Sequence, residues 1–351
     1  MIDHFFELLN LVSIEVMGLF VIFFFTTIFW KNIYQSLSLK PYKSRQRLHF
    51  DEVPRIGGLI IYVFLVITAL IFYQSKLLNI ILISAIPLIF IGAKEDLYHN
   101  TSPKIRLIFM ILSASLFIYL LPTKLPEIDF LIVDKIFSLA FVKEAFFVFS
   151  ILVIINGNNL IDGVNGNMAL TNIVQLCVVA SMAFSVNDHE IMELSFILLI
   201  PLFVFLIFNF PFGKIFSGDA GSYYYGFSIS ASIIYLFGVY DQLLSWGAVL
   251  ILIYPSIELL FSFFRKIFYE NTSPFTPDCS HLHSLIFRHY VKQFKIFNNS
   301  FAVIFLLPFI FAPFMIYLLI DDFFGILLLI FLESVLYITM YLFFLNLVSR
   351  K

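Results

Sequence analysis

Long apolar runs separated by short polar segments dominate this sequence. A helix that crosses a membrane needs about 20 mainly apolar residues, because the hydrocarbon core is about 30 Å thick and a helix rises about 1.5 Å per residue. Backbone groups facing lipid must pair within their own segment, so we expect an all-α, polytopic membrane protein. The runs predict about eleven spans, at residues 11–30, 56–74, 77–93, 105–121, 138–155, 168–186, 191–210, 222–240, 243–262, 301–320 and 323–347.

The fifth run is the least regular of these. Between Glu127 and Glu144, acidic residues are mixed with apolar ones, so this segment could instead form a helix at the membrane interface. The first run has Asp3 and Glu7 ahead of it and no basic segment, which is not typical of a cleaved signal peptide.

Composition agrees with the pattern. Hydrophobic residues make up 61% of the 351 residues and charged residues 13%, against roughly 45–50% and about 25% in soluble domains. The 47 Phe residues are more than a soluble core of this size could bury. These figures exclude a soluble enzyme, a disordered protein and a small secreted domain. The net charge of -2 gives no electrostatic reason to expect a nucleic-acid partner.

The basic residues fall unevenly on the two sides that eleven spans define. Seventeen of the 21 Lys and Arg residues lie on one side, and the other side has only Lys76, Lys124, Lys135 and Lys143. Cytoplasmic loops normally carry the excess of basic residues. We therefore expect the N-terminus outside and the C-terminus in the cytoplasm.

Nearly all the unusual polar residues lie in five cytoplasmic segments, at residues 31–55, 94–104, 156–167, 211–221 and 263–300. Functional groups often sit on loops at one face of a rigid scaffold. The one-sided distribution predicts a single domain over residues 1–351 with its site at the cytoplasmic membrane surface. It argues against a channel through the middle.

Two of these segments place acids at helix ends. Glu95 and Asp96 follow an apolar run directly, where the helix dipole disfavours negative charge. A divalent ion, or Lys104 and Arg106 across the loop, would compensate them; a solvated turn with a loose ion pair is the alternative. Asp219 precedes another run, where it could cap the helix or share its N-terminus with phosphate oxygens.

The segment Asn156 to Leu170 is rich in oxygen ligands. It contains four Asn residues and Asp162 within ten positions, of the kind that Mg²⁺ binds together with substrate phosphates. Its three Gly and four Asn residues disfavour a helix, so we expect a loop over residues 156–167. A purely structural turn is the alternative.

Two histidines stand out in the last polar segment. His281 and His283 are two residues apart, so they can face one direction in a turn but not on a helix. They could hold phosphate or uracil, or bind zinc with Asp278 and Cys279. A plain surface loop is again the alternative.

Taken in order, these motifs are recognisable: GG, an acidic pair with a downstream KxR, NxxNLIDGxxG, KIFxGDxGS and HLH. From about His49 to His283 the chain resembles the polyprenyl-phosphate N-acetylhexosamine-1-phosphate transferases, glycosyltransferase family 4. The resemblance implies transfer of a sugar-1-phosphate from a UDP-sugar to undecaprenyl phosphate, releasing UMP. It also implies Mg²⁺ as cofactor, which Mn²⁺ could replace, and the first step of a cell-surface glycan pathway at the plasma (inner) membrane.

The resemblance also assigns roles to individual residues. It gives the catalytic groups as Glu95, Asp96, Asp162 and Lys104, and the metal ligands as Asp219 and Asn159. We expect the substrate-binding residues to be Arg55, Arg106, Asn165, His281 and His283.

Three positions depart from the family pattern. Glu95 replaces the usual first Asp of the acidic pair but keeps a carboxylate. Asn165 stands where an acid is often found, as in some branches of the family. Ser284 replaces a further His, which leaves the nucleotide contacts the least defined part of the prediction.

The reaction would join two polyanions, so catalysis should rest on positioning and charge neutralisation. A transporter of lipid-linked sugars is the competing class, and a non-catalytic scaffold is a third. A transporter should bury paired ionisable groups near the midplane. Here Glu15, Glu258 and Glu333 lie inside spans, and none has an obvious basic partner in the sequence. A homodimer is compatible with the sequence.

Overall fold

The computed structural model describes residues 17–29, 53–139, 141–274, 276, 280–294, 298–318 and 322–349. Throughout these ranges the secondary structure is helical. Seven helical segments are long and apolar enough to cross a membrane: Lys76–Tyr98, Pro103–Leu120, Val142–Ile161, Asn167–Ser185, His189–Asn209, Asn299–Ile316 and Phe323–Ser349. Two shorter apolar helices, Met17–Phe29 and Gly57–Ile71, accompany them. The protein is therefore a polytopic, all-helical membrane protein, as predicted.

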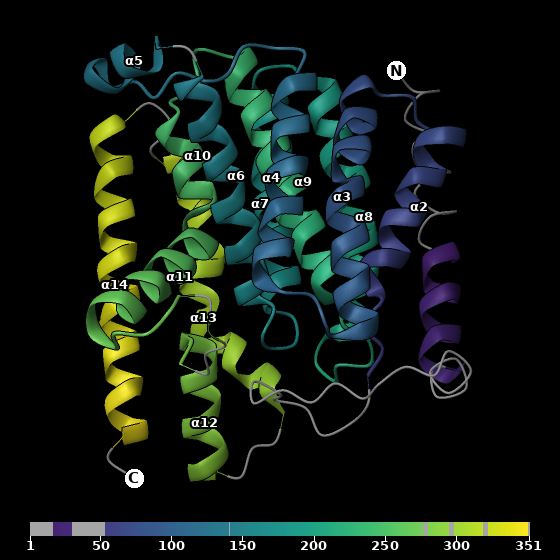
Figure 1. The fold of residues 1–351 in the computed structure, drawn as a ribbon, viewed down its shortest axis with the longest axis vertical. Helices are drawn as coiled ribbons and strands as arrows, with labels where there is room; N and C mark the ends of the chain where they lie inside the picture. The colour runs from purple at the N-terminus through teal and green to yellow at the C-terminus, as the bar shows by residue number, and fades with distance from the viewer. Residues whose placement is uncertain are drawn as a thin grey trace.

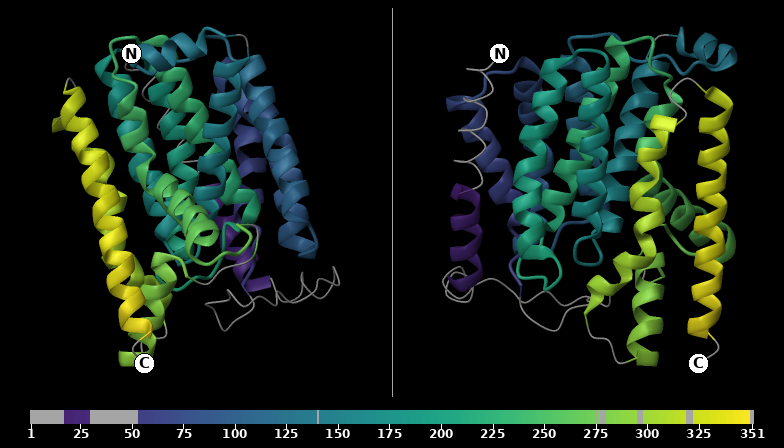
Figure 2. Two further views of the ribbon diagram at one scale, coloured as in Figure 1. Left: turned by 60° about the vertical axis from the view of Figure 1, so that its left-hand side comes forward. Right: turned by 180° about the vertical axis from the view of Figure 1, so that it is seen from behind.

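The main helices after Met17–Phe29 follow in chain order. They are α2 (Gly57–Ile71), α3 (Lys76–Tyr98), α4 (Pro103–Leu120), α5 (Leu131–Phe137), α6 (Val142–Ile161), α7 (Asn167–Ser185), α8 (His189–Asn209), α9 (Gly218–Val239), α10 (Trp246–Ile251), α11 (Ile253–Phe264), α12 (Leu282–Phe294), α13 (Ala302–Phe311) and α14 (Phe323–Ser349). Most run along the long axis of the molecule, with α5 across one end and α12 at the other (Figure 1). The two further views show α14 beside the bundle on the side of α12 (Figure 2).

Side chains fix several helix starts. Ser75 and Ser102 accept the backbone N–H groups of residues three positions on, at 3.1 and 3.4 Å, and Asp188 does the same at 3.0 Å. Such caps satisfy donors that the first helical turn leaves unpaired. At the other end of α3, His99 adopts the left-handed conformation with φ 51°, which ends the helix.

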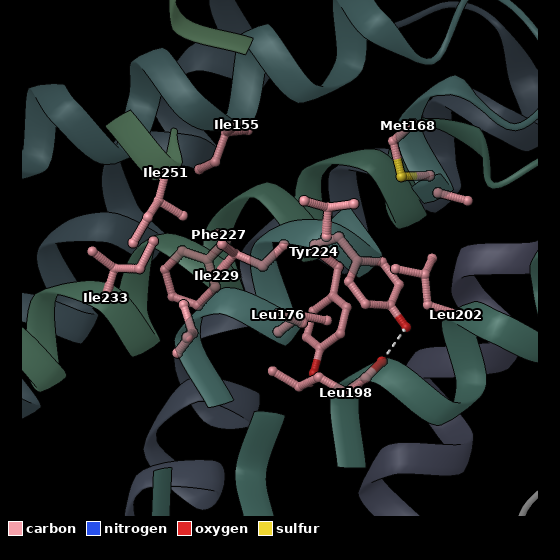
Figure 3. Packing of buried hydrophobic residues seen from close by; sticks show 14 of the residues in the cluster. Ile155, Met168, Leu176, Leu198, Leu202, Tyr224, Phe227, Ile229, Ile233 and Ile251 are labelled. Atoms are coloured by element: carbon pink, nitrogen blue, oxygen red, sulfur yellow. Dashed lines mark hydrogen bonds between the residues drawn. The ribbon is translucent and has the colours of Figure 1, made fainter. Parts of the chain in front are cut away.

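Helix α9 is the centre of the bundle. It packs against α2, α3, α6, α7 and α8, and nearly all its residues are buried although it is rich in Ser, Gly and Tyr. Its serine hydroxyls donate to carbonyls one turn back, as at Ser228 and Ser232. Around it, side chains from α6, α7, α8, α9 and α10 meet in a continuous apolar core (Figure 3).

Small residues let the neighbours approach α9 closely. A Cβ on Gly92 of α3 would lie 2.5 Å from the Cα of Ala220, and a Cβ on Gly58 of α2 would lie 2.0 Å from the Cα of Gly221. Close backbone contact at small residues is the usual way to pack membrane helices. The Gly57-Gly58 pair therefore both starts α2 and admits α9.

The predicted span 243–262 is broken into α10 and α11 at Leu252. Pro255 has no N–H to donate to the carbonyl of Ile251, four residues back. Gln175 of α7 fills that place, with Nε2 donating to the Ile251 carbonyl at 3.0 Å. The break is thus stabilised by a side chain from a neighbouring helix, as buried carbonyls require.

The irregular fifth run resolves into two helices. The short helix α5 covers Leu131–Phe137, and the span α6 begins only at Val142, four residues later than predicted. Asp134 of α5 accepts the N–H groups of Ile128 and Phe130, each at 3.0 Å, which fixes the turn before it. Both readings of this run were therefore partly right.

Candidate active site

The site is built at one end of the bundle, where α3 and α6 end and α4 and α9 begin. This is the end that carries α12, opposite α5 (Figure 1). The four basic residues assigned to the other side lie away from this end. Lys76 is the first residue of α3, Lys124 lies in the loop after α4, Lys135 lies in α5, and Lys143 lies in the first turn of α6. Their separation from the polar motifs is therefore a property of the fold.

The segment before α9 is held by the segment before α2. The N–H groups of Gly57 and Gly58 donate to the carbonyls of Phe216 and Ser217 at 3.0 and 2.9 Å, and Phe216 N–H donates to the Pro54 carbonyl at 2.8 Å. These three backbone hydrogen bonds place Arg55 beside the N-terminus of α9.

Asp96 caps α9 from a different helix. Its Oδ1 accepts the N–H of Asp219 at 2.8 Å, and its Oδ2 accepts the N–H of Ala220 at 3.0 Å. Arg55 Nε donates to Oδ1 at 3.5 Å. Gly218 has φ +71°, and a Cβ there would lie 2.3 Å from Asp96 Oδ2, so this approach requires glycine. The compensating charges for Asp96 are therefore Arg55 and the helix N-terminus, and the expected partners Lys104 and Arg106 do not contact it.

Four side chains contact the carboxylate of Asp219. Arg106 Nη1 approaches its Oδ2 at 2.9 Å, and the Tyr223 hydroxyl donates to the same oxygen at 2.8 Å. Asn159 Nδ2 donates to Oδ1 at 3.2 Å, and Arg55 Nη2 lies 3.6 Å from Oδ1. Three predicted site residues thus converge on the predicted metal ligand. The alternative of a plain N-cap at Asp219 is wrong, because Ser217 occupies the cap position and Asp219 is the second helical residue.

The predicted loop over residues 156–167 is partly wrong. Residues 156–161 are the last turns of α6, and the loop begins at Asp162. Tertiary contacts outweigh the poor helix propensity: Asn158 Nδ2 donates to the Ser222 carbonyl at 2.7 Å and Asn159 Nδ2 to its hydroxyl at 2.9 Å. Gly157 packs where a Cβ would lie 2.1 Å from the Pro255 carbonyl.

Asp162 faces the same helix start from the other side. Its Oδ2 accepts a hydrogen bond from the Ser217 hydroxyl. Burial raises the pKa of Asp162 to about 7, although the Ser217 hydrogen bond and Arg55 work in the opposite direction. Asp96 and Asp162 therefore both hold the segment Ser217–Ala220 that presents Asp219.

Glu95 and Lys104 stand further out. Glu95 Oε2 accepts the N–H of Thr101 at 2.8 Å, which closes the turn between α3 and α4. Lys104 is exposed in the first turn of α4, and within the described residues it forms no ion pair. The structure places both beside the site without a contact to Asp219.

Asn165 is a structural tie. Its Nδ2 donates to the Pro211 carbonyl at 3.1 Å, and its N–H donates to Asn299 Oδ1 at 3.3 Å. Asn209 completes the join, because its Oδ1 accepts the Gly166 N–H at 2.6 Å and its Nδ2 donates to the Ile215 carbonyl at 2.8 Å. The loops before α7 and before α9 are thereby fastened to each other.

The two histidines do face one direction. Their rings stack in parallel at 3°, with centroids 5.7 Å apart. His281 precedes α12, and its Nδ1 lies 2.9 Å from Glu258 Oε1. Burial, aided by the neighbouring His281 and Arg288, lowers the pKa of His283 to about 4, so this ring is neutral at pH 7. The expectation that Glu258 lacks a basic partner is wrong, since the partner lies 23 residues away in the sequence.

The zinc alternative depends on Asp278 and Cys279 as further ligands. Asp278 and Cys279 lie outside the described residues. Among the described residues, no three His, Cys, Asp or Glu side chains are grouped to hold a metal. A site for Mg²⁺ is a different matter, because that ion takes one or two carboxylates and completes its shell with water and phosphate oxygens.

The donors at Asp219 fit Mg²⁺. They consist of the Asp219 carboxylate and the Asn159 amide. The amide now directs Nδ2 at Asp219, and a 180° rotation of the amide group would bring its oxygen to the same place as a metal ligand. Arg55 and Arg106 on the same carboxylate show that it carries a negative charge that a cation neutralises. An ion held there by two protein oxygens would have further coordination positions for water and phosphate oxygens.

Sequence reasoning missed Ser217, Ser222 and Tyr223. Tyr223 lies four residues after Asp219, and residues at this spacing meet on one helix face, so the run GDAGSYYY did contain the signal. Ser217 and Ser222 carried no such signal, because their partners come from α6 and the loop after it.

Comparison with known proteins gives the same family as the motifs. A model of glycosyl transferase family 4 matches residues 78–237, which include most of α3 and most of α9. The probable undecaprenyl-phosphate N-acetylglucosaminyl 1-phosphate transferase of Bacillus subtilis is 31% identical over 276 residues, which cover 77% of this chain and 74% of the relative. The chain belongs to glycosyl transferase family 4.

Two further relatives extend the comparison. The undecaprenyl-phosphate alpha-N-acetylglucosaminyl 1-phosphate transferase of Thermotoga maritima is 28% identical over 246 residues, covering 69% of this chain and 71% of the relative. The protein of that name in Escherichia coli K12 is 22% identical over 289 residues, covering 80% and 78%. The similarity therefore extends well beyond the stretch matched by the family model.

Proposed function

We propose that this protein transfers N-acetylglucosamine 1-phosphate from UDP-N-acetylglucosamine to undecaprenyl phosphate and releases UMP. The observation that carries the proposal is the convergence of Arg55, Arg106 and Asn159 on the Asp219 carboxylate at the N-terminus of α9. Cations, amide groups and a helix N-terminus gathered at one point suit a diphosphate and a lipid phosphate. The names of the family relatives supply the sugar.

We propose eleven crossings, with the N-terminus outside and the active site in the cytoplasm. The seven long spans, the helices Met17–Phe29 and α2, the central α9 and the broken pair α10–α11 together make this number. The excess of basic residues at the α12 end supports the orientation. Such a site lies where a membrane lipid and a soluble nucleotide sugar can meet, in the plasma membrane.

In the proposed mechanism, Asp219 and Asn159 would hold Mg²⁺. The chemistry supplied by such an ion would be neutralisation of charge on the diphosphate and on the departing UMP. Arg106 and Arg55, which now pair with Asp219, provide guanidinium groups for phosphate oxygens. Lys104, exposed beside them, attracts the lipid phosphate.

Asp96 and Asp162 act on the position of Asp219 in this proposal. Both oxygens of Asp96 accept backbone N–H groups of α9, so no lone oxygen is left directed at a substrate. Glu95 then remains to orient the lipid phosphate. A strong base is not essential, because a phosphate monoester has a second pKa of about 6 and is largely ionised at pH 7.

The test is a transfer assay. Membranes containing the protein are given undecaprenyl phosphate and a panel of radiolabelled UDP-sugars, with Mg²⁺ or with EDTA. We expect labelled lipid and UMP with UDP-N-acetylglucosamine and Mg²⁺. Absence of labelled lipid with every donor would overturn the proposal.

Asp219→Ala tests the metal assignment in the same assay. We expect a loss of about 10²- to 10³-fold in turnover, on the order of what removing a group that stabilises transition-state charge costs. Asp241→Asn is the matched control, because Asp241 is an exposed acid paired with Lys124 at the opposite end of the bundle. Retained Mg²⁺-dependent turnover in Asp219→Ala would contradict the assignment.

A further inference from the structure

Glu258 is a buried acid to which the proposed mechanism gives no role. Its side chain is 1% exposed and it lies on α11, within the bundle. Ionisable groups at such depth are costly and usually have specific partners. Here both carboxylate oxygens are engaged: Oε1 lies 2.9 Å from His281 Nδ1, and Oε2 accepts the Tyr337 hydroxyl at 2.8 Å.

The contact continues from His281 to the loop that carries Asp162. The His281 ring stacks in parallel on His283 at 5.7 Å. His283 Nε2 lies against Gly163, where a Cβ would come within 2.1 Å of it. A row of contacts therefore joins α14, through Glu258 and the two rings, to the residue next to Asp162.

A carboxylate on one imidazole nitrogen decides what the other can do. Glu258 has only acceptor oxygens when ionised, so His281 Nδ1 carries the proton and Nε2 is the free nitrogen. A carboxylate behind the ring also stabilises its protonated form, which can then donate Nε2–H to an anion.

We infer that Glu258 is a positioning residue that fixes the tautomer and orientation of His281 and supplies its counter-charge, with Tyr337 holding Glu258 in place. When the ring is protonated, His281 thereby directs Nε2–H toward a phosphate of the nucleotide sugar. This inference rests on the proposed function and adds a second set of contacts, from α11 and α14, to the same site.

Other titratable groups surround the pair. Tyr254 of α11 interacts with Glu258, and Tyr337 of α14 interacts with it and with Tyr341. His283 and Arg288 come from α12. None of these supplies a second carboxylate to His281, so replacement of Glu258 removes the negative charge that it faces.

The test compares Glu258→Gln with the wild type in the transfer assay as a function of pH. We expect kcat/KM for UDP-N-acetylglucosamine to fall by 10- to 100-fold, the usual effect of losing the partner of a functional His. The pH profile should change as well, because the replacement removes the carboxylate that faces His281 Nδ1. Tyr337→Phe should change both in the same direction but less.

Glu333→Gln is the matched control. Glu333 lies one turn before Tyr337 on α14 and, among the residues that the structure describes, forms no hydrogen bond or ion pair with His281, so its loss should leave the pH profile unchanged. Glu258→Asp should restore part of the wild-type profile. A folded Glu258→Gln protein with the wild-type pH profile would overturn the inference, whether or not its melting temperature falls. If Glu258→Gln does not fold, Tyr337→Phe with an unchanged profile would overturn it as well.

A second measurement does not require turnover. ¹⁵N spectra of histidine-labelled protein, with His281→Gln used for assignment, report which ring nitrogen carries the proton. We expect protonated Nδ1 in the wild type and a mixture of tautomers in Glu258→Gln. Unchanged spectra would overturn the inference even where transfer is normal, whereas an absence of transfer in the wild type would overturn the proposed function alone.

Discussion

Asp96→Asn tests whether Asp96 holds Asp219 in place or takes a proton from the substrate. The carboxylate accepts two backbone N–H groups of α9, at 2.8 and 3.0 Å. Asn keeps one acceptor oxygen and turns an NH₂ group toward the other N–H. Each hydrogen bond to a charged group is worth about 1.5–3 kcal/mol, and the favourable interaction with the helix N-terminus about 0.3–2 kcal/mol. We therefore expect a loss of about 3 kcal/mol.

This loss should appear in two measurements on purified protein. With about 2.1 cal/mol/K of unfolding entropy per residue, 3 kcal/mol lowers the melting temperature of a chain of this length by about 4 °C. Displacement of Asp219 should lower kcat/KM about 10²-fold and raise the Mg²⁺ concentration for half-maximal rate. Glu95→Gln is the control for melting and Mg²⁺ dependence, since Gln retains the oxygen that accepts Thr101 N–H. Wild-type melting and Mg²⁺ dependence in Asp96→Asn, with a pH-dependent fall in kcat alone, would refute the reasoning and favour a general base.

Two further predictions concern the fold around the same helix. Gly58→Ala places a Cβ 2.0 Å from the Cα of Gly221, so we expect at least about 3 kcal/mol of destabilisation. It should be seen as a lower melting temperature and a reduced yield of folded protein. An unchanged melting temperature would show that α2 and α9 do not touch there. The pKa of Asp162 is raised to about 7 in the folded protein, against about 4 in the unfolded chain. The folded state therefore favours the protonated carboxyl, and the contribution of Asp162 to the free energy of unfolding is complete below about pH 4 and is lost as the pH rises through about 7. In EDTA between pH 5 and 8, the melting temperature of the wild type should therefore fall relative to that of Asp162→Asn, and parallel curves would contradict the raised pKa.

The apolar runs predicted most of the fold because span length is imposed by the membrane. What they could not predict were features set by contacts between distant segments. Residues 156–161 have poor helix propensity, yet they are helical because Asn158 and Asn159 bond to Ser222 of α9. The break at Leu252 follows from Pro255, but its stability depends on Gln175 of α7.

The site shows the same division. The contact of Asn159 and Arg106 with Asp219 agrees with the prediction that these residues share one site, which was made because acids, amides and guanidinium groups are suited to phosphate and Mg²⁺. The part played by Asp96 could not be predicted, because the N–H groups that it accepts lie 123 and 124 residues further along the chain. Residues 31–52, most of the first predicted cytoplasmic segment, lie outside the described residues.

The burial of α9 also bears on how the protein enters the membrane. This helix has 22 residues, most of them shielded from lipid, and it is not among the seven segments apolar enough to cross by composition alone. Segments rich in polar residues insert poorly on their own. If α9 crosses the bilayer as proposed, we expect it to insert together with the earlier helices that it packs against, such as α3 and α6, and the active site to assemble only after them.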